Sequence, residues 1–180
     1  MRRCRASAAG KLTVVLATIV LVLAGCGGGP SPRAWAASVC TALTPWRSEI
    51  SKLTSSTDEQ MTAQTTPAQA KENLVRLFGG AEQASEAARR KVEQAGVPET
   101  ENGDAISAGF RSSLEKMRDA YGRARDTIDG LGTGEATAFY DGVRAAVDTL
   151  NTEYDASALD TSKLNSEELK KAFDEVPECH

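Results

Sequence analysis

The amino-acid sequence predicts an all-α protein, an antiparallel four-helix-type bundle with a short fifth helix at its C-terminus and one disulfide. Apolar residues recur at alternating three- and four-residue steps through four long segments, which is the period of an amphipathic helix. Short stretches rich in Pro or Gly separate these segments, as in bundles of antiparallel helices. Aromatic residues make up only 5% of the chain, and no segment alternates with the period of a strand.

The first predicted helix runs from about Arg33 to Leu53. Pro45 lies inside it, and because proline has no N–H to donate, we expect a kink or a break between Ala42 and Pro45. The polar, Thr-rich segment from Ser55 to Gln64 is predicted to be a loop. The inner stripe of this helix is expected to comprise Trp35, Val39, Leu43, Trp46, Ile50 and Leu53.

The second predicted helix begins at Pro67 and ends at Gly96-Val97-Pro98. Thr66 and Gln69 are expected to form a capping box, with proline at the first helical position. Gly79-Gly80 costs about 1 kcal/mol per glycine relative to alanine and indicates a bend or the close approach of a neighbouring helix. The predicted inner stripe comprises Ala70, Leu74, Leu77, Ala81, Ala84, Ala88 and Val92.

Two further long helices complete the body of the predicted bundle. The third runs from about Asp104 to Asp129 and the fourth from about Glu135 to Tyr154, with a glycine-rich turn between them. Their inner stripes are expected to comprise Ile106, Phe110, Leu114, Met117, Tyr121, Ala124 and Ile128 in the third, and Phe139, Val143, Val147, Leu150 and Tyr154 in the fourth.

A short fifth helix is predicted near the C-terminus. The segment from Ala156 to Lys163 is interpreted as a loop, after which Asn165 with Glu168 makes a capping pattern. The helix is expected to extend to about Phe173, before Val176-Pro177 stops it.

The first 25 residues have the three parts of a bacterial export signal. Basic residues precede an uncharged apolar run of about a dozen residues, Leu12 to Leu23, and the tetrapeptide Leu23-Ala24-Gly25-Cys26 closes it. The run is too short to span the roughly 30 Å of bilayer hydrocarbon comfortably, which favours a signal peptide over a transmembrane helix. The basic residues are Arg2, Arg3, Arg5 and Lys11.

The tetrapeptide Leu23-Ala24-Gly25-Cys26 resembles the bacterial lipobox. The resemblance implies cleavage before Cys26 and attachment of a diacylglyceryl group to its thiol, and two acyl chains anchor a protein stably. An ordinary secretory signal with a coincidental cysteine is the alternative. We expect a lipoprotein signal peptide at 1–25, a lipid anchor and flexible tether at 26–32, and a helical domain at 33–180 on the outer face of the cytoplasmic membrane.

The acidic charge of the chain argues against two classes of partner, nucleic acids and anionic lipid surfaces. The chain carries a net charge of −4, and loss of residues 1–25 would remove four basic residues and no acidic one, leaving −8. Nucleic-acid affinity comes mainly from Lys and Arg that neutralise phosphates, so this acidic domain is not expected to bind nucleic acid. Anionic lipids would repel it weakly, so its membrane attachment is expected to come from the lipid on Cys26.

Three cysteines remain once the signal is removed: Cys26, Cys40 and Cys179. If lipidation consumes Cys26, an exported chain keeps two thiols, and an even number in an oxidising compartment favours a disulfide. We predict a Cys40–Cys179 disulfide that closes a loop of about 140 residues and stabilises the fold by at most roughly 5 kcal/mol on the chain-entropy model. Two separate free thiols are the alternative.

The sequence shows no recognisable catalytic, metal or cofactor motif, and we expect a non-enzymatic protein without a cofactor. The single histidine is the C-terminal residue, His180, which argues against both a Ser-His-Asp site and a histidine metal site. Gly130 to Gly134 follows a predicted helix and lacks the Gly-Lys-Ser/Thr ending of a phosphate-binding loop, so we interpret it as a turn. The cluster Arg89-Arg90-Lys91 is flanked by Glu86 and Glu93, which predicts ion pairs on an exposed helix face.

Trp35 and Trp46 could serve either a structural role or a ligand site. Their place on the inner stripe favours the core. The expected irregularity at Pro45 could instead open a ligand crevice between them.

With Trp35-Ala36-Ala37-Ser38-Val39-Cys40 near its start and Pro177-Glu178-Cys179 near its end, the chain resembles uncharacterised actinobacterial lipoproteins and small secreted proteins. The resemblance covers the arrangement of the mature chain and implies a Gram-positive-like cell envelope. It supports the disulfide and supplies no active site.

These observations lead to one functional hypothesis and two alternatives. The leading hypothesis is a membrane-anchored, non-enzymatic binding or scaffolding module whose partner is an envelope protein or a small ligand. The first alternative is a carrier for an apolar molecule between helices near Trp35, Trp46 and Gly79-Gly80. The second is an enzyme that uses only carboxylates. An apolar cavity would favour the carrier, and an exposed apolar patch would favour a protein partner.

Overall fold

The computed structural model describes residues 28–157 and 164–180. Within these ranges every element is helical, which confirms the predicted all-α class. The predicted signal peptide at 1–25, Cys26, and residues 158–163 of the loop predicted before the fifth helix lie outside the described residues. None of the described helices is long and apolar enough to span a membrane.

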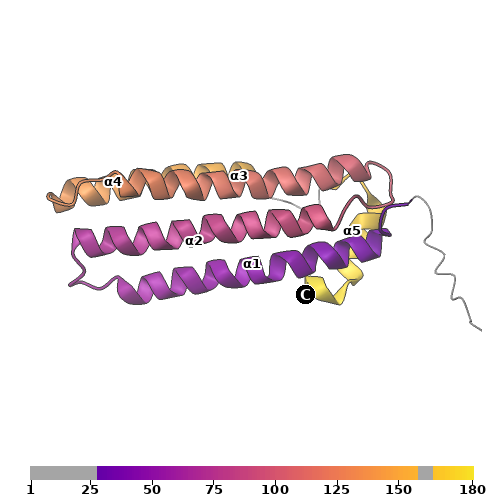
Figure 1. Cartoon of the computed structure of the whole chain (residues 1–180), viewed down its shortest axis with the longest axis horizontal. Helices are drawn as coiled ribbons and strands as arrows, with labels where there is room; N and C mark the ends of the chain where they lie inside the picture. Colours follow the sequence, from indigo (N-terminus) through magenta and orange to yellow (C-terminus); the bar gives the residue numbers. More distant parts are fainter. Residues whose placement is uncertain (1–27, 158–163) are drawn as a thin grey trace, which may run out of the picture.

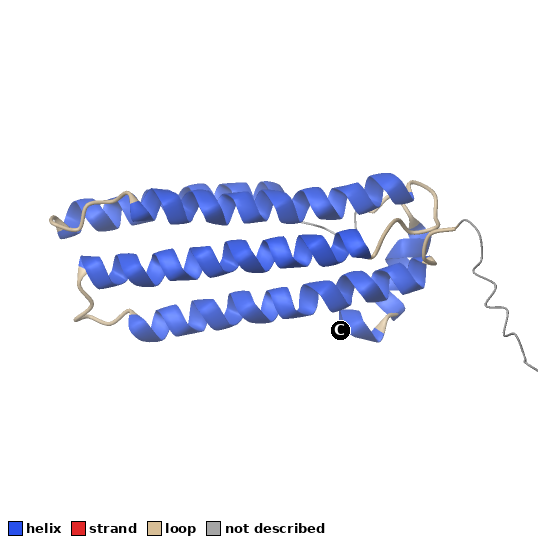
Figure 2. Cartoon of the chain, viewed as in Figure 1, coloured by secondary structure: helices blue, strands red, loops and turns tan. Residues whose placement is uncertain are grey.

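Four long antiparallel helices form the body of the molecule, and α1, α2 and α3 lie side by side with α4 behind α3 (Figure 1). Short loops join them, as the colouring by secondary structure shows (Figure 2). The elements are α1 (Pro32–Gln60), α2 (Pro67–Gln94), α3 (Gly103–Asp129), α4 (Ala136–Ser157), α5 (Glu167–Glu175) and the 3-10 helix η2 (Pro177–Cys179).

The α2–α3 pair is the centre of the bundle. α1 packs on α2, and α4 packs on α3 with only slight contact to α2. Among the described residues, α1 and α4 form no extensive interface with each other, so the four helices do not close into a complete ring. The flank of α1 near its N-terminus is covered instead by α5 and η2.

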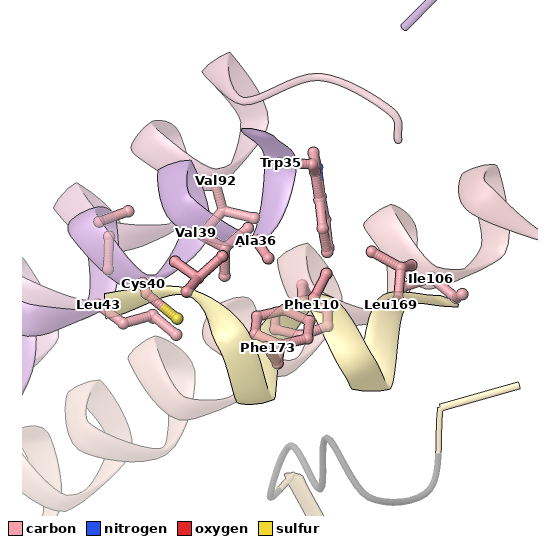
Figure 3. Close-up of a cluster of buried hydrophobic side chains, with 14 of the residues drawn as sticks. Trp35, Ala36, Val39, Cys40, Leu43, Val92, Ile106, Phe110, Leu169 and Phe173 are labelled. Carbon is pink, nitrogen blue, oxygen red and sulfur yellow. The ribbon is translucent and has the colours of Figure 1, made fainter. Parts of the chain in front are cut away.

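Two apolar clusters fill the bundle, one toward each end. The proximal cluster lies beside the start of α1, where α5 and the ends of α2 and α3 meet (Figure 3). The distal cluster joins α2, α3 and α4 toward the other end. The proximal cluster comprises Trp35, Ala36, Val39, Cys40, Ala42, Leu43, Ala88, Val92, Ile106, Phe110, Leu114, Leu169, Ala172, Phe173 and Val176. The distal cluster comprises Leu74, Phe78, Ala81, Met117, Ala120, Tyr121, Ala124, Ile128, Ala146 and Leu150.

The predicted disulfide joins Cys40 of α1 to Cys179 of η2. The two sulfurs are 2.02 Å apart, and the bridge spans 139 residues of sequence. It therefore ties the C-terminal segment covalently to the first helix, next to the proximal cluster. The alternative of two free thiols is wrong for this structure.

α1 extends to Gln60, so the prediction of a loop from Ser55 to Gln64 was wrong over its first six residues. The inner stripe continues past Leu53 to Thr57, whose side chain is buried. The Thr54 hydroxyl donates to the Ile50 carbonyl at 2.9 Å, so a polar side chain on the helix surface is satisfied without a loop. Packing of the stripe outweighs the weak helix propensity of Ser and Thr.

The helix also continues through Pro45, so the predicted break does not occur. Proline inside a helix costs about 3 kcal/mol or more, chiefly because one backbone hydrogen bond is missing. Burial of Leu43 before Pro45 and partial burial of Trp46 after it hold both halves of α1 on the bundle.

The predicted start of α2 is confirmed. Thr66 and Gln69 form a reciprocal capping box, and Pro67 is the first residue of the helix. The end is also as predicted, because Gly96, the residue after the C-cap Ala95, adopts a φ of +76°, a conformation that glycine reaches without strain.

Three other boundary predictions need correction. The cap of α5 is Ser166 rather than Asn165, because the Ser166 hydroxyl accepts the Leu169 amide at 3.2 Å. α5 ends at Glu175 instead of Phe173. α4 extends to Ser157, so the predicted loop was wrong at its first two residues. Burial of Ser157 and the hydrogen bond from its hydroxyl to the Tyr154 carbonyl account for the extra turn.

The inner stripe of α2 differs from the prediction at two positions. Phe78 is buried in place of Leu77, and Ser85 is buried in place of Ala84. In each case the residue one position further along the helix is buried, and the buried positions still follow three- and four-residue steps along one stripe of α2.

Gly80 marks the close helix approach that the glycine pair predicted. A Cβ placed on Gly80 would lie 2.8 Å from Cδ1 of Leu53 in α1, closer than carbon atoms pack. A Cβ on Gly79 would lie 3.6 Å from Cδ of Arg125, which is ordinary contact. Only the second glycine is therefore in a tight contact, which the tip of the Leu53 side chain makes.

The two glycines offer a matched stability test. Gly79→Ala is expected to raise the free energy of unfolding by up to about 1 kcal/mol, because alanine is the better helix former and space is available. Gly80→Ala is expected to give no gain or a loss of about 1 kcal/mol, because Leu53 must shift. Urea unfolding of both variants measures the difference, and equal stabilisation by the two alanines would contradict the close approach at Gly80.

Candidate functional site

Trp35 belongs to the core. Its side chain is 0% exposed and makes edge-to-face contacts with Phe110 and Phe173, with ring centroids 5.2 Å and 6.0 Å away. The indole Nε1 donates to the Gly96 carbonyl at 3.0 Å, so its one polar group is satisfied inside the protein. The rings lie together in the proximal cluster (Figure 3).

Trp46 is partly buried between the proximal and distal clusters. Its Nε1 donates to the Ser85 hydroxyl at 3.0 Å, and that hydroxyl donates in turn to the Ala81 carbonyl at 2.8 Å. The structure thus places both tryptophans, considered above for a ligand crevice, in packed positions with their indole donors used. The hollows described below are lined by other residues.

A charged groove runs along the outer side of the α2–α3 pair. Glu86 lies at its centre and accepts from Arg89 Nε at 2.9 Å, Arg90 Nε at 2.8 Å and Arg118 Nη1 at 3.0 Å. The groove has a volume of about 490 Å³ and is lined by Glu82, Gln83, Glu86, Ala87, Arg90, Arg118 and Arg125. The expected ion pairing around the Arg89-Arg90-Lys91 cluster is present, and it also reaches across to α3.

The electrostatics of this groove are those of a paired network. Hydrogen bonds from Arg89, then Arg90, and then Arg118 hold the pKa of the Glu86 carboxyl well below its usual range. Pairing with Glu86 raises the pKa of Arg89, and hydrogen bonds to Asp119 and then to Glu86 raise the pKa of Arg118. Arg125 pairs with Glu82 on the same groove. The arginines that line it have carboxylate partners, so the groove stabilises the α2–α3 contact and is not an empty anion site.

Glu86→Gln is expected to lower the free energy of unfolding by about 1 kcal/mol at neutral pH, because three charge-assisted hydrogen bonds are lost. The folded protein keeps Glu86 ionised, whereas the unfolded chain protonates this carboxyl near its ordinary pKa of 4.5. Its stabilisation is present above that pH and is lost as the pH falls, so wild type and variant should converge in acid. Urea unfolding from about pH 7 to about pH 3 tests this. Glu167→Gln, at an 89% exposed side chain, is the control, and a difference that grows in acid would contradict the role of Glu86.

The end of the bundle farthest from the start of α1 carries a hollow with a polar lining, which we call the distal hollow. It lies over the α1–α2 loop and the first turns of α2 and has a volume of about 390 Å³. Hydroxyl and amide side chains dominate its lining, and a single carboxylate is the only charged group. The lining comprises Gln60, Thr62, Gln64, Thr65, Gln69, Glu72 and Asn73.

The backbone beneath the distal hollow is held by side-chain hydrogen bonds. The Thr65 hydroxyl donates to the Gln60 carbonyl at 3.0 Å and accepts the Thr62 amide at 2.8 Å. The capping box of Thr66 and Gln69 fixes the adjoining start of α2. The loop is therefore pre-organised without a ligand.

A second hollow of about 450 Å³ adjoins the first, and Glu72 belongs to both. Lys71 lies in it and donates to the Leu131 carbonyl at 3.1 Å, so the α3–α4 turn is tied to α2. The other lining residues are Ala68, Val75, Arg76, Asp129 and Thr133. The lining of this hollow therefore combines basic and acidic side chains with the small aliphatic side chains of Ala68 and Val75.

Sequence reasoning missed the distal hollow, because its residues are divided between the segment interpreted as a plain loop, which holds Gln60, Thr62 and Gln64, and the start of the second helix. The available signal was the density of Thr and Gln around the α2 capping box. That signal indicates a polar segment but not a hollow, because the hollow forms only where the end of α1 lies beside the start of α2.

Other site chemistry is limited in the part of the chain that the structure describes. No group of three His, Cys, Asp or Glu residues is placed to hold a metal there. His180 is exposed, with its Nε2 2.9 Å from the Asp174 carbonyl oxygen. Residues 130–135 join α3 to α4, as expected for a turn between helices. Comparisons with protein-family models, curated proteins and solved structures found no match to this chain.

Proposed function

We propose that this protein is a membrane-anchored lipoprotein of the cell envelope that acts as a non-enzymatic binding or scaffolding module. The lipid on Cys26 would hold it on the outer face of the cytoplasmic membrane, and an envelope protein or a small ligand would bind its polar surface. The order of basic residues, apolar run and lipobox-like tetrapeptide in residues 1–26 motivates the anchor.

The observation that carries the proposal is the arrangement of the bundle: the segment that leads to the proposed anchor lies at one end, and the two hollows lie at the other. Residues 28–31 lead into α1 at the proximal end, where the Pro30 carbonyl accepts the Glu99 amide at 2.9 Å. The α1–α2 and α3–α4 loops lie at the opposite end (Figure 1). A helix of 28 residues such as α2 rises about 42 Å, so an anchor at Cys26 would place both distal hollows about that far from the tether.

The exposed surface supports recognition through polar groups. Among the described residues, Val97 and Tyr140 are the exposed large hydrophobic side chains, and they lie on different segments. A protein partner that docks through a broad apolar patch would need more apolar surface than these two residues offer. The carrier alternative places its ligand beside Trp35, Trp46 and Gly79-Gly80, where both indoles are packed and hydrogen-bonded within the protein and Leu53 lies against Gly80.

Cys26→Ser is expected to move the protein from the membrane pellet to the soluble extracytoplasmic fraction, because the acylated thiol is lost. Mass spectrometry of the membrane-extracted wild type should show a chain that begins at Cys26 and carries a diacylglyceryl mass. A Cys26→Ser protein that stays with membranes, or a wild type that begins at Met1, would contradict the proposal. Cys4→Ser, which alters only the proposed signal, is the matched control.

Partner binding is tested by crosslinking on intact cells, followed by purification of the protein under denaturing conditions. A binding module is expected to give discrete crosslinked species that disappear when the distal end is altered, for example by Glu72→Arg. Crosslinks that are insensitive to every change at the distal end would contradict the assignment of that end as the binding surface.

A further inference from the structure

We infer that the distal hollow is a carbohydrate-binding site, which recognises a polyhydroxylated ligand through amide and hydroxyl side chains. The inference deepens the proposed function and rests on it for the orientation of the site away from the membrane. The geometry of the hollow itself does not depend on the anchor.

The lining determines the chemical class of the ligand. Of the seven residues that form the hollow, six are Gln, Asn or Thr, and Glu72 is the one charged residue. A single carboxylate without a partner cation disfavours phosphate and other anions. The absence of aliphatic and aromatic side chains from the lining disfavours an apolar molecule. A neutral ligand rich in hydroxyl groups remains, because each sugar hydroxyl both donates and accepts, as amides do.

The polar groups divide into those that hold the protein and those that face the hollow. Thr62, Thr65 and the Gln69 carbonyl oxygen are used in the loop and the capping box. The side chains of Gln64, Asn73 and Glu72 take no part in the hydrogen bonds and ion pairs among the described residues. Two amides and one carboxylate therefore line one hollow on a backbone that is already fixed, which lowers the entropic cost of binding.

An extended peptide fits this site less well. Peptide recognition usually needs a free sheet edge, an apolar groove or an aromatic slot, and the distal hollow provides none of them. Its volume of about 390 Å³ is of the size of a small-molecule site and accommodates one or two sugar rings.

The test uses the full chain purified in a polyoxyethylene detergent, since detergents with sugar headgroups would compete. The probes are the soluble trimer of N-acetylglucosamine, maltotriose and a trialanine peptide, followed by saturation-transfer NMR and titration. At least one saccharide is expected to bind, and Gln64→Ala or Asn73→Ala is expected to weaken that binding about five- to tenfold, by loss of a hydrogen bond. Asn151→Ala, at an exposed position on α4, is the matched control and should leave binding unchanged.

The outcomes are distinct. Saccharide binding that is weakened by Gln64→Ala or Asn73→Ala but not by Asn151→Ala supports the site. Absence of saccharide binding at millimolar concentration, binding of trialanine in its place, or saccharide binding unaffected by both hollow variants overturns it. Fractionation of Cys26→Ser measures the anchor separately, so either proposal can fail while the other holds.

Discussion

Simultaneous replacement of Cys40 and Cys179 by Ala is expected to lower the free energy of unfolding by about 2–5 kcal/mol. The disulfide spans 139 residues, so its loss restores conformational freedom to most of the chain in the unfolded state. The chain-entropy model gives about 5 kcal/mol for such a loop, and native disulfides usually contribute somewhat less. Urea unfolding of wild type and double variant measures the change through the shift in midpoint.

Reduction provides the control for this experiment. Wild type unfolded in the presence of dithiothreitol should match the double variant, since both lack the bridge. Titration of unreduced, unfolded wild-type chain should detect no free thiol at either position. Equal midpoints for oxidised and reduced wild type would contradict the predicted stabilisation. A loss confined to the variant would indicate disturbed packing at the partly buried sulfurs instead.

Trp35→Ala is expected to lower the free energy of unfolding by about 3–5 kcal/mol, the range for truncation of a large buried aromatic side chain. The substitution removes the edge-to-face contacts with Phe110 and Phe173 and leaves a cavity where α1, α3 and α5 meet. The Gly96 carbonyl loses the indole donor but keeps the Ser107 hydroxyl at 2.9 Å, so the loss is mainly one of packing.

Two further variants test whether the loss of stability in Trp35→Ala comes from the loss of a buried ring. Trp35→Phe keeps much of the buried ring and is expected to cost about 1–2 kcal/mol. Tyr140→Ala removes a ring that is 38% exposed and is expected to cost under 1 kcal/mol. Thermal and urea unfolding rank the three variants. A Trp35→Ala protein as stable as Tyr140→Ala would contradict the central place of Trp35 in the proximal cluster.

Much of the fold could be predicted from the sequence, because the periodic apolar positions correspond to real buried stripes. The start of α2 was predictable from the Thr66, Pro67 and Gln69 pattern, since a capping box is a local interaction. The pairing of Cys40 with Cys179 followed from counting thiols rather than from geometry. The core role of Trp35 followed from its position on the stripe.

The remaining features depend on contacts that local patterns do not encode. Thr57 lies in a stretch with the composition of a loop, yet it belongs to α1 and its side chain is buried. Ser85 looks like a surface residue, but the Trp46 indole needs an acceptor at that point of the neighbouring helix. The distal hollow arises because Gln60 and Asn73, from two different helices, come to line one surface.

The covalent link between the first helix and the last turn has a consequence for biogenesis. On the proposed export route, the N-terminal part of the chain would carry Cys40 across the membrane well before Cys179, and the earlier sulfur would wait there as a thiol. Thiols that wait in an oxidising compartment are open to exchange with any other sulfur. Acylation of Cys26, as proposed, would remove the one competing thiol of the mature chain and leave Cys40 a single intramolecular partner.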